Sequence, residues 1–357
     1  MKLNKSIGIL GGGQLASMLT HSAQKLGLQV HIYSESNLDP AAALANSHTK
    51  GSLSSLSRIE KWAEQLDVVT YESEFTDLKD LKLKNVSPSS KVMSIVRDRL
   101  SQKQLLEKFK IPTSPFTQDF SPKFTKSVVF KQRLFGYDGY GTVVCKNTRD
   151  YHKFFIRNRN LGDWIVEDFI PFKKELAFSI ARTKKDSFCI LPLVETFQKD
   201  SKCFWVKGPV ENKKLNSLIS KVKKMMTATK YVGILAVELF ETKNGDLIVN
   251  ELAPRVHNSA HYSVEGLNLS QFDIHNLAIL GEDLPARVKP LSAFSMVNLI
   301  GSGSKKPQIQ LPLLGSLTWY NKTPNKPGRK MGHITVLDKT PSSALRSALY
   351  EERRQSL

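Results

Sequence analysis

Near the N-terminus, short apolar runs alternate with segments that carry apolar residues at helical spacing. Residues 6–10 and 28–33 form apolar runs, and residues 15–26 between them place apolar side chains along one helical face. Residues 53–66 again have helical spacing, and residues 67–71 form another apolar run. Such runs indicate buried strands, and such spacing indicates amphipathic helices. Alternating strands and helices predict a Rossmann-like α/β unit with a parallel sheet.

After a boundary predicted at residues 111–112, apolar runs become more frequent and are separated by glycine, proline or charged turns. This pattern predicts a β-rich remainder with a few helices. Strands are expected at residues 127–131, 142–146, 164–170, 176–182, 188–195, 295–300 and 333–337. Helices are expected at residues 97–109, 212–227 and 270–280, and a last helix is expected to begin at residue 342.

The strongest local signal is the dipeptide Asn-Gly at residues 244–245, in the segment LAVELFETKNGDLIVNELAPRVHNSAH. Both residues tolerate the positive φ of a two-residue type I′ hairpin turn, and such a turn sets the pairing of its two strands. Counting outward from the turn places Phe240 opposite Val249. The same count places Glu238 opposite Glu251, so two carboxylates are expected to face each other.

Opposed like charges destabilise a β-ribbon unless a cation neutralises them. Mg²⁺ takes oxygen ligands and is bound in proteins by one or two carboxylates together with phosphate oxygens. Glu238 and Glu251 therefore predict a Mg²⁺ clamp for a nucleotide, and a solvated strand edge with ordinary surface acids is the alternative. The clamp is favoured by nearby polar residues that suit an anionic substrate, namely Arg255, His257, Asn258, Ser259 and His261.

A glycine-rich turn follows the first predicted strand. Gly11, Gly13 and Ala16 satisfy the pattern G-x-G-x-x-[GA]. Glu35 lies at the end of the next strand, where an acid binds ribose in a dinucleotide fold. This match predicts phosphate binding at a helix N-terminus without establishing a dinucleotide. The acids within residues 72–74 lie at the carboxyl edge of the same sheet, where such sheets bind ligands.

A second glycine-rich segment, GYDGYG at residues 136–141, lies between two predicted strands. Its glycines allow backbone N–H groups to close over phosphates. Lys131 adds a cation at the end of the preceding strand. A phosphate-binding loop is therefore predicted here, and a plain glycine-rich hairpin turn is the alternative.

Composition narrows the class of protein. The 357 residues suffice for two or three domains, and no run resembles an export leader or approaches the roughly 20 apolar residues of a membrane span. The scattered residues Cys145, Cys189 and Cys203 predict reduced thiols in the cytoplasm. The net charge of +19 suits nucleic acid, anionic membranes or small phosphorylated ligands. Because basic residues are spread along the chain, a generally basic surface is favoured over nucleic-acid or membrane binding.

Seven segments, in this order, resemble those of the N5-carboxyaminoimidazole ribonucleotide synthetases of the ATP-grasp superfamily. They are ILGGGQL, RDRLSQKQLLEKFKIPTSPF, FGYDGYG, VNELAPRVHNSAHY, SQFDIHNLAILGEDLP, MVNLIG and GRKMGHITVL. The resemblance covers nearly the whole chain and implies an α/β protein that is α+β in its ATP-grasp part. The expected units are a Rossmann-like domain at 1–97, an ATP-grasp lid with its connecting helix at 98–170, a central ATP-grasp domain with the metal hairpin at 171–290 and a C-terminal β-rich part at 291–357.

The resemblance implies a ligase of de novo purine synthesis. ATP and bicarbonate would give carboxyphosphate, and the exocyclic amine of 5-aminoimidazole ribonucleotide would capture its carboxyl group. ATP and Mg²⁺ are the implied cofactors, the substrates are the implied partners, and a cytoplasmic homodimer is expected. One alternative is a catalytically impaired homologue that binds nucleotide. Another is an NAD-dependent dehydrogenase, which rests on the N-terminal glycine pattern.

The resemblance also assigns roles to individual residues. It implies that ATP contacts Arg99, Lys131, Gly136, Tyr137, Asp138, Gly139, Tyr140, Gly141, Thr142, Gln198, Asn250 and Glu251, with Glu167, Asp168, Phe169 and Ile170 as the adenine hinge and Glu175 at the ribose. The ribonucleotide would contact Gln14, Leu15, Glu74, Asn258, Lys322, Arg329 and Lys330, with Glu72 as an alternative to Glu74. Mg²⁺ is implied at Glu238 and Glu251, and catalysis at Tyr137, Arg255, His257 and Lys330. Strict alternation points Asn250 away from the metal pair, so a β-bulge is expected there.

Some positions depart from the family pattern. They are Tyr140, where the phosphate loop usually has Lys or Arg; Gln198, where a His touches the nucleotide; Ala260, where Gly is usual; and Ala16-Ser17, where Gly-Arg is common. Tyr140 removes a cation from the loop over the triphosphate, and Gln198 removes a charge near it. The intact metal pair and the intact GRKMGH loop favour an active enzyme with weakened ATP binding.

Overall fold

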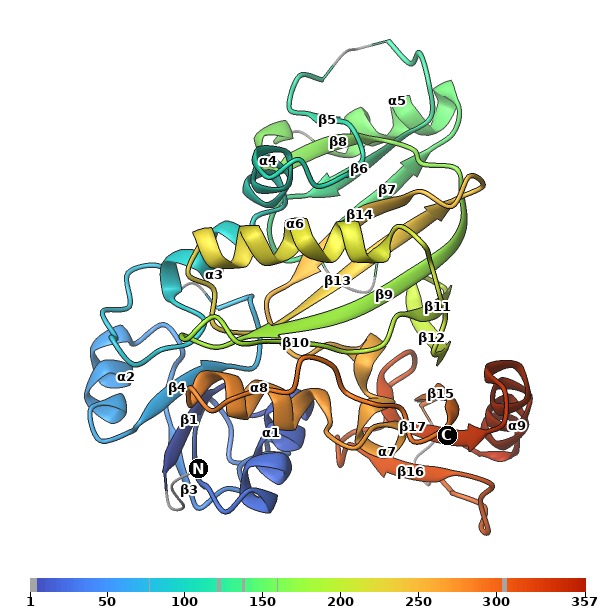
Figure 1. The fold of residues 1–357 in the computed structure, drawn as a ribbon. Helices are drawn as coiled ribbons and strands as arrows, with labels where there is room; N and C mark the ends of the chain where they lie inside the picture. Colours follow the sequence, from blue (N-terminus) through green and yellow to red (C-terminus); the bar gives the residue numbers. More distant parts are fainter. Residues whose placement is uncertain (1–4, 77, 121–122, 137–138, 159, 304–306) are drawn as a thin grey trace.

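The computed structural model describes residues 5–357, except residues 77, 121–122, 137–138, 159 and 304–306. The strands of these described residues form three sheets. Figure 1 shows the N-terminal sheet in blue at the lower left and a small sheet at the top, here called the lid sheet. The large sheet lies between them and continues to the red C-terminal part at the right.

The N-terminal sheet is parallel, and its strand order is β3-β2-β1-β4. Its strands are β1 (Ser6–Leu10), β2 (Gln29–Ser34), β3 (Ser47–Lys50) and β4 (Val68–Tyr71), with helices α1 (Gln14–Lys25) and α2 (Leu56–Ala63) between them. The expected Rossmann-like unit is therefore confirmed. Strand β3 was not expected, because its polar sequence SHTK carries no apolar run.

The lid sheet is antiparallel and has the order β5-β8-β6-β7. Its strands are β5 (Phe116–Thr117), β6 (Val128–Gln132), β7 (Thr142–Cys145) and β8 (Trp164–Asp168), joined by α5 (Thr148–Arg157) and the 3₁₀ turn η1 (Leu161–Asp163). Phe130 and Phe154 stack in its core at a centroid distance of 3.6 Å. Helices α3 (Ser90–Arg97) and α4 (Arg99–Lys108) lead from the N-terminal sheet to the lid.

The large sheet has nine antiparallel strands in the order β14-β13-β9-β11-β12-β15-β17-β16, and β10 pairs with β9. Its strands are β9 (Phe172–Arg182), β10 (Phe188–Ile190), β11 (Val194–Lys199), β12 (Lys202–Gly208), β13 (Gly233–Thr242), β14 (Leu247–Ala253), β15 (Ala293–Ile300), β16 (Ser316–Trp319) and β17 (Lys330–Asp338). The accompanying helices are α6 (Leu215–Ala228), η2 (Asn258–Ala260), α7 (Ser263–Gly266), α8 (Gln271–Ile279) and α9 (Pro341–Arg354).

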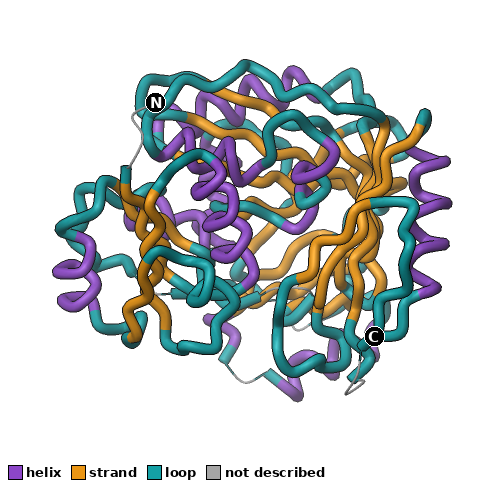
Figure 2. Tube along the Cα trace, turned by 90° about the horizontal axis from the view of Figure 1, so that it is seen from below, coloured by secondary structure: helices purple, strands orange, loops and turns teal. Residues whose placement is uncertain are grey.

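Helices cover both faces of the large sheet, as the tube in Figure 2 also shows. Helix α6 packs its apolar stripe on β9 and β13, where Val222 and Met226 are fully buried. Helix α8 contacts β9 and β13 and also contacts α1 of the N-terminal sheet. Its Asn276 donates to the carbonyl oxygen of Leu19 at 3.2 Å. Helix α9 packs on β12, β15 and β17. The contacts of α8 attach the N-terminal sheet to the large sheet.

One predicted helix is confirmed with small changes at its ends, and one predicted strand is interrupted. The helix expected at residues 97–109 is α4, which begins at Arg99 because Asp98 is extended and its carboxylate accepts the N–H of Leu100 as an N-cap. The preceding helix α3 was not expected. The strand expected at residues 188–195 is two strands. Pro192 lies in the break and lacks the N–H that a continuous strand would donate.

The turn of the β13–β14 hairpin differs from the predicted type I′ turn. The N–H of Gly245 donates to the carbonyl of Thr242, and the N–H of Thr242 donates to the carbonyl of Asp246, both at 3.0 Å. The loop thus has three residues, and Gly245 (φ +74°) takes its left-handed position while Asn244 does not have a positive φ. The extra loop residue places Phe240 opposite Ile248, so the predicted Phe240–Val249 pair is wrong.

A β-bulge then restores the register at the carboxylates. The pairing shifts between Glu238 and Leu239, because Asn250 is the extra residue on β14. Glu238 consequently lies opposite Glu251, as predicted. The bulge expected at Asn250 is confirmed.

Candidate active site

A cleft of about 1130 Å³ lies where the three sheets meet. Of the residues to which the sequence assigned a role, those lining it are Gln14, Leu15, Glu74, Arg99, Lys131, Gly136, Gly139, Tyr140, Thr142, Glu167, Asp168, Phe169, Ile170, Glu175, Gln198, Glu238, Asn250, Glu251, Arg255, His257, Asn258, Lys322, Arg329 and Lys330. Tyr137 and Asp138 lie outside the described residues. Segments far apart in the chain therefore supply one continuous surface.

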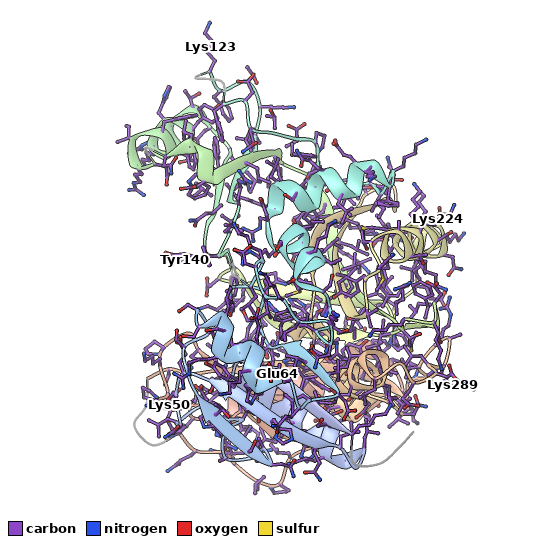
Figure 3. The ribbon with its side chains drawn as sticks, turned by 90° about the vertical axis from the view of Figure 1, so that its left-hand side faces the viewer. Lys50, Glu64, Lys123, Tyr140, Lys224 and Lys289 are labelled. Atoms are coloured by element: carbon purple, nitrogen blue, oxygen red, sulfur yellow. The ribbon has the colours of Figure 1, made fainter. Side chains whose placement is uncertain are left out.

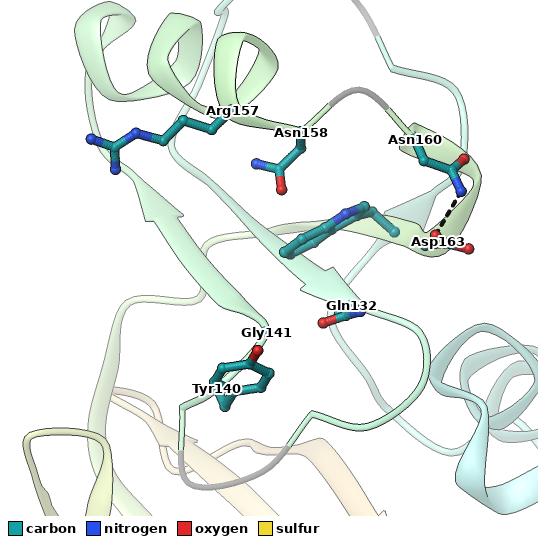
Figure 4. A pocket seen from close by; sticks show the side chains of 8 residues that line it. Gln132, Tyr140, Gly141, Arg157, Asn158, Asn160 and Asp163 are labelled. Carbon is teal, nitrogen blue, oxygen red and sulfur yellow. Dashed lines mark hydrogen bonds between the residues drawn. The ribbon is translucent and has the colours of Figure 1, made fainter.

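Gly141 lies at a neighbouring hollow on the lid instead. Figure 4 shows this hollow, which has a volume of about 380 Å³ and also borders Tyr140, Gln132, Asn158 and Asp163. Tyr140 borders both cavities and is 66% exposed. In Figure 3 it lies between the lid at the top and the N-terminal sheet at the bottom.

A buried carboxylate, Glu167 on β8, lies at the lid side of the cleft. One of its oxygens, Oε2, is 3.2 Å from Nζ of Lys131 and 3.1 Å from Nζ of Lys103, and it accepts the hydroxyl of Ser114. Burial favours the neutral acid, but the two lysine charges outweigh burial and lower the pKa of Glu167 to about 2. The other oxygen, Oε1, is buried and has no hydrogen-bond partner within the described part of the chain.

Sequence reasoning missed Lys103 and Ser114 as part of this group. Lys103 lies on α4 and is 1% exposed. A signal was present, because the helical spacing places this lysine on the same face as buried Leu106, where an apolar residue is expected. Its partner Glu167 lies 64 positions away in the sequence, so spacing alone did not reveal the pair.

The bulge directs Asn250 towards the same group. Lys131 donates to Oδ1 of Asn250 at 2.8 Å, which joins the lid strand β6 to the metal hairpin. The outer edge of β14 is covered by the segment after α4, since the N–H of Val249 donates to the carbonyl of Pro112 at 2.8 Å. The register of the hairpin is therefore held by contacts with the lid side of the molecule.

The opposed carboxylates Glu238 and Glu251 lie next to this group. Arg99 donates to Oε2 of Glu251 at 3.0 Å, and Nε2 of His257 is 3.5 Å from Oε1 of Glu238. Burial and the charge of Glu251 raise the pKa of Glu238 to about 7. Burial and two nearby cations, Arg255 and Lys330, lower the pKa of His257 well below its usual value, so its imidazole is neutral at pH 7.

This donor set fits Mg²⁺, which prefers carboxylate oxygens and completes its shell with phosphate and water oxygens. The raised pKa of Glu238 reflects a repulsion that a divalent cation would remove. No group of three or more His, Cys, Asp or Glu side chains suited to a metal occurs in the described part of the chain. A metal held by this pair would take its remaining ligands from phosphate or water oxygens.

The opposite end of the cleft is basic. Lys322 donates to the carbonyl of Lys330 at 3.0 Å, and Arg329 donates through Nη1 to the carbonyls of Thr323 and Pro324 at 3.1 Å. These contacts hold the loop that carries the predicted phosphate-binding pair. Lys330 is also the first residue of β17, three positions earlier than the predicted strand start.

Glu74, and not Glu72, lines this end of the cleft. Its carboxylate accepts Nη2 of Arg255 at 2.8 Å and also accepts Nε of the same guanidinium. Nearby, Gln14 on α1 hydrogen-bonds Nε2 of His261 at 3.0 Å. The N-terminal sheet thus contributes side chains directly to the cleft.

Glu72 instead occupies the glycine-rich turn. Its carboxylate accepts the N–H of Gly13 at 2.7 Å and that of Leu15 at 3.2 Å. A Cβ at Gly13 would lie 2.4 Å from Oε1 of Glu72, which explains the glycine. Because the chain's own carboxylate takes the N–H groups at this helix N-terminus, the prediction of phosphate binding there is wrong.

Glu35, the acid expected to bind ribose, also lies outside the cleft. It accepts the hydroxyl of Ser52 and the N–H of Leu53, both at 3.3 Å. The carboxylate of Glu72 occupies the glycine-rich turn, and Glu35 is hydrogen-bonded to Ser52 and Leu53. The N-terminal sheet therefore does not form a dinucleotide site. This removes the basis for the dehydrogenase alternative.

Glu175 on β9 and Gln198 on the neighbouring strand β11 both line the cleft. Burial raises the pKa of Glu175 to about 7, although the N–H of Gln198 donates to its carboxylate. The rings of Phe172 and Phe240 stack beside them at a centroid distance of 4.5 Å. An acid beside an apolar wall suits the ribose and base of a nucleotide.

Close approach and backbone conformation explain the glycines Gly136, Gly139 and Gly141. A Cβ at Gly136 would lie 2.0 Å from Nη1 of Arg99. Gly139 (φ +77°) and Gly141 (φ +70°) adopt the left-handed conformation. The loop can therefore lie next to the cation that contacts Glu251.

Comparisons with known proteins agree with this architecture. The ATP-grasp domain model matches residues 104–272, the ribonucleotide synthetase preATP-grasp domain model matches residues 4–97, and the phosphoribosylaminoimidazole carboxylase C-terminal domain model matches residues 295–347. An N5-carboxyaminoimidazole ribonucleotide synthase from Synechococcus elongatus is 36% identical over 92% of this chain and 89% of its own length.

Solved structures of the same kind of protein also match. The Staphylococcus aureus synthetase complexed with ADP has a TM-score of 0.88 and 29% identity, and the match covers 99% of this chain and 98% of that one. The Aspergillus clavatus synthase in complex with ADP and 5-aminoimidazole ribonucleotide has a TM-score of 0.86 and 28% identity, with coverage of 99% and 100%.

Fold and site together define an ATP-grasp enzyme of the carbon–nitrogen ligase type. The chain belongs to the N5-carboxyaminoimidazole ribonucleotide synthase family. The resemblance and the fold class expected from the sequence are thereby confirmed. Among the described residues, the structure has no helix long and apolar enough to cross a membrane.

Proposed function

We propose that this protein uses ATP to carboxylate 5-aminoimidazole ribonucleotide with bicarbonate. The terminal phosphoryl group of ATP passes to bicarbonate and gives carboxyphosphate and ADP. The exocyclic amine of the ribonucleotide then attacks the carboxyl carbon, phosphate leaves, and the amine loses a proton. The observation that carries the proposal is a single cleft that joins the carboxylate pair Glu238 and Glu251 to a nucleotide-suited lid side and a basic far end.

Residues on the lid side suit ATP. The unpartnered Oε1 of Glu167 suits the exocyclic amine of adenine, since a buried carboxylate oxygen needs a donor. Lys131 and Arg99 supply cations beside the phosphate loop. Mg²⁺ at Glu238 and Glu251 would neutralise charge on the transferring phosphoryl group. Closure of the lid would exclude water from carboxyphosphate, which hydrolyses readily.

Residues at the other end suit the ribonucleotide. Arg329 and Lys330 would bind its phosphate, and Gln14, Leu15, Glu74, Asn258 and Lys322 would position the rest of the molecule. Arg255 donates to the carboxylate of Glu74, and this contact fixes the position of the guanidinium in the cleft. His257 and Lys330 line the cleft, and we propose that these two residues take part in catalysis. The catalytic role expected of Tyr137 is kept as part of the proposal.

We keep the four units expected from the sequence, residues 1–97, 98–170, 171–290 and 291–357, as part of the proposal. The separate N-terminal and lid sheets support the first two units, whereas the large sheet runs through the boundary expected at residues 290–291, because β12 pairs with β15. A cytoplasmic homodimer is likewise proposed, and the three free, buried cysteines are consistent with a reducing compartment.

The direct test is an assay of ADP release with bicarbonate and 5-aminoimidazole ribonucleotide both present and with each omitted in turn. Carboxylation is followed in parallel with ¹³C-bicarbonate. We expect ADP release that depends on the ribonucleotide and a labelled carboxyl group on its amine. A folded sample that binds ADP but shows neither signal would instead support the impaired, nucleotide-binding homologue.

Replacing Arg329 with alanine is expected to raise the KM for the ribonucleotide by about 10- to 100-fold, because a hydrogen bond to a charged phosphate is lost. The KM for ATP should stay near its original value, since Arg329 lies at the far end of the cleft. Arg346→Ala on the exposed side of α9 is the matched control. Steady-state kinetics in each substrate decide the matter, and a defect confined to ATP would contradict the assignment.

Replacing Tyr140 with lysine is expected to lower the KM for ATP by about two- to fivefold, because a cation returns to the phosphate loop. The effect is modest because the exposed position is screened by solvent and salt. Tyr350→Lys, at a 56% exposed site on α9, adds the same charge away from the cleft. An unchanged or higher KM for ATP would show that Tyr140 has another role in the loop.

A further inference from the structure

Lys103 is the most deeply buried lysine of the described chain, and it does not itself line the cleft. Its Nζ donates to the hydroxyls of Thr113 at 2.7 Å and Ser114 at 2.8 Å, and it lies 3.1 Å from Oε2 of Glu167. It does not line the cleft, whereas Glu167 and Lys131 do. Lys103 therefore contacts Glu167 from the protein interior, whereas Glu167 and Lys131 face the cleft.

The cluster of Lys103, Lys131 and Glu167 has two positive side chains and one negative side chain. Two ammonium groups, Lys103 and Lys131, share one carboxylate oxygen of Glu167. A buried carboxylate that had Lys131 as its single ionic partner would bind that ammonium tightly and neutralise it. With Lys103 present, Glu167 has a permanent partner on its protein side. The charge of Lys131 then remains available on the cleft side.

We propose that Lys103 is a positioning residue that neutralises Glu167 from behind, so that Lys131 is left charged for a nucleotide phosphate and Oε1 of Glu167 is left open for adenine. This inference rests on the proposed function, because it assumes that the lid side of the cleft takes ATP. Lys103 itself touches neither nucleotide nor reacting atoms. It acts through the two residues that do.

The surroundings of Lys103 support this role. The groups that face it are the hydroxyls of Thr113 and Ser114, the carboxylate of Glu167, and the more distant charges of Lys131 and Glu251. Burial lowers the pKa of Lys103 to about 8, and Glu167 offsets part of that effect. Lys103 is therefore charged at pH 7 and loses its proton as the pH rises through about 8, which is within the range of a binding experiment.

The experiment is titration calorimetry of ADP with Mg²⁺ into the whole protein and into Lys103→Met, which keeps an unbranched side chain of nearly the same length and removes the charge. We expect at least about tenfold weaker ADP binding and a similar rise in the KM for ATP, with the KM for the ribonucleotide unchanged. Lys108→Met removes the same charge from an exposed position on the same helix and should bind ADP normally.

A pH series separates this role from a merely structural one. ADP affinity of the unaltered protein should fall as pH rises through 8, because Lys103 loses its charge, and Lys103→Arg should keep its affinity to about pH 9.5, since guanidinium stays protonated. If the variants do not fold, the unaltered protein alone decides, and a flat profile up to pH 9.5 would overturn the inference. Normal ADP binding by Lys103→Met would also overturn it. If the unaltered protein did not bind ADP at all, the proposed function would fail instead.

Discussion

Replacing Glu238 with glutamine is expected to lower carboxylation at least about 100-fold and, at the same time, to stabilise the metal-free protein. The activity falls because one of the two charges that would hold Mg²⁺ is lost. The stability rises because Glu238 lies opposite Glu251, and burial together with that like charge raises its pKa to about 7. The gain should be about 1–2 kcal/mol, a value reduced for the partial exposure of the side chain.

The pH dependence of this gain has a definite sign. An acid whose pKa is higher in the folded than in the unfolded protein destabilises the fold once it ionises. For Glu238 the penalty is absent below its ordinary pKa near 4.5 and complete above about 7. The difference in unfolding free energy between Glu238→Gln and the original protein should therefore grow from pH 4.5 to pH 7.

Urea unfolding without metal measures the stability, and the carboxylation assay measures the activity. Glu241→Gln is the control, because Glu241 lies on the same strand and its carboxylate accepts Asn212 outside the cleft. If Glu238→Gln turned over normally with an unchanged dependence on Mg²⁺, the metal would have to bind elsewhere.

Replacing Glu167 with glutamine is expected to destabilise the protein by about 3–5 kcal/mol, because Lys103 and Lys131 would be left buried without an ionic partner. Glu167 has a folded pKa of about 2, below its ordinary 4.5. An acid with a lowered pKa stabilises the fold above its unfolded pKa and loses that contribution as pH falls through the folded value. The original protein should therefore lose this stability between pH 4.5 and 2, and Glu167→Gln should not.

The measurement is urea unfolding of both proteins at neutral pH and along an acid series. Glu107→Gln, an exposed position on α4, controls for the loss of one carboxylate. A loss under about 1 kcal/mol for Glu167→Gln would show that the two lysines find other partners or lose their charges when Glu167 is neutral.

The hairpin shows how far local sequence reasoning reaches. The Asn-Gly signal predicted a hairpin of two strands and placed its turn within one residue. The turn type was wrong, and the Glu238–Glu251 pair was nevertheless right, because the bulge at Asn250 compensates for the third loop residue. That bulge was expected from the family resemblance. Strict alternation of side chains between the two faces of a strand does not predict an extra residue.

The glycine-rich turn shows where a motif alone misleads. The pattern Gly11, Gly13 and Ala16 correctly predicted a strand, a tight turn and a helix. It does not specify what fills the N-terminus of that helix. The carboxylate of Glu72 comes from the end of β4, the strand that pairs with β1, and it takes the place that a phosphate takes in a dinucleotide fold.

The sequence by itself determined many of the elements of this protein, the opposed carboxylates and, through the order of its motifs, its family. Those properties depend on local periodicity, turn chemistry and motif order, which are read directly along the chain. Only the tertiary structure showed that Glu74 rather than Glu72 lines the cleft. Only the tertiary structure showed that buried Lys103 forms an ion pair with Glu167. A buried charge is stable only with partners, and here Lys131 and Glu167 come from the paired lid strands β6 and β8, while Lys103 comes from α4, a helix far from β8 in the sequence.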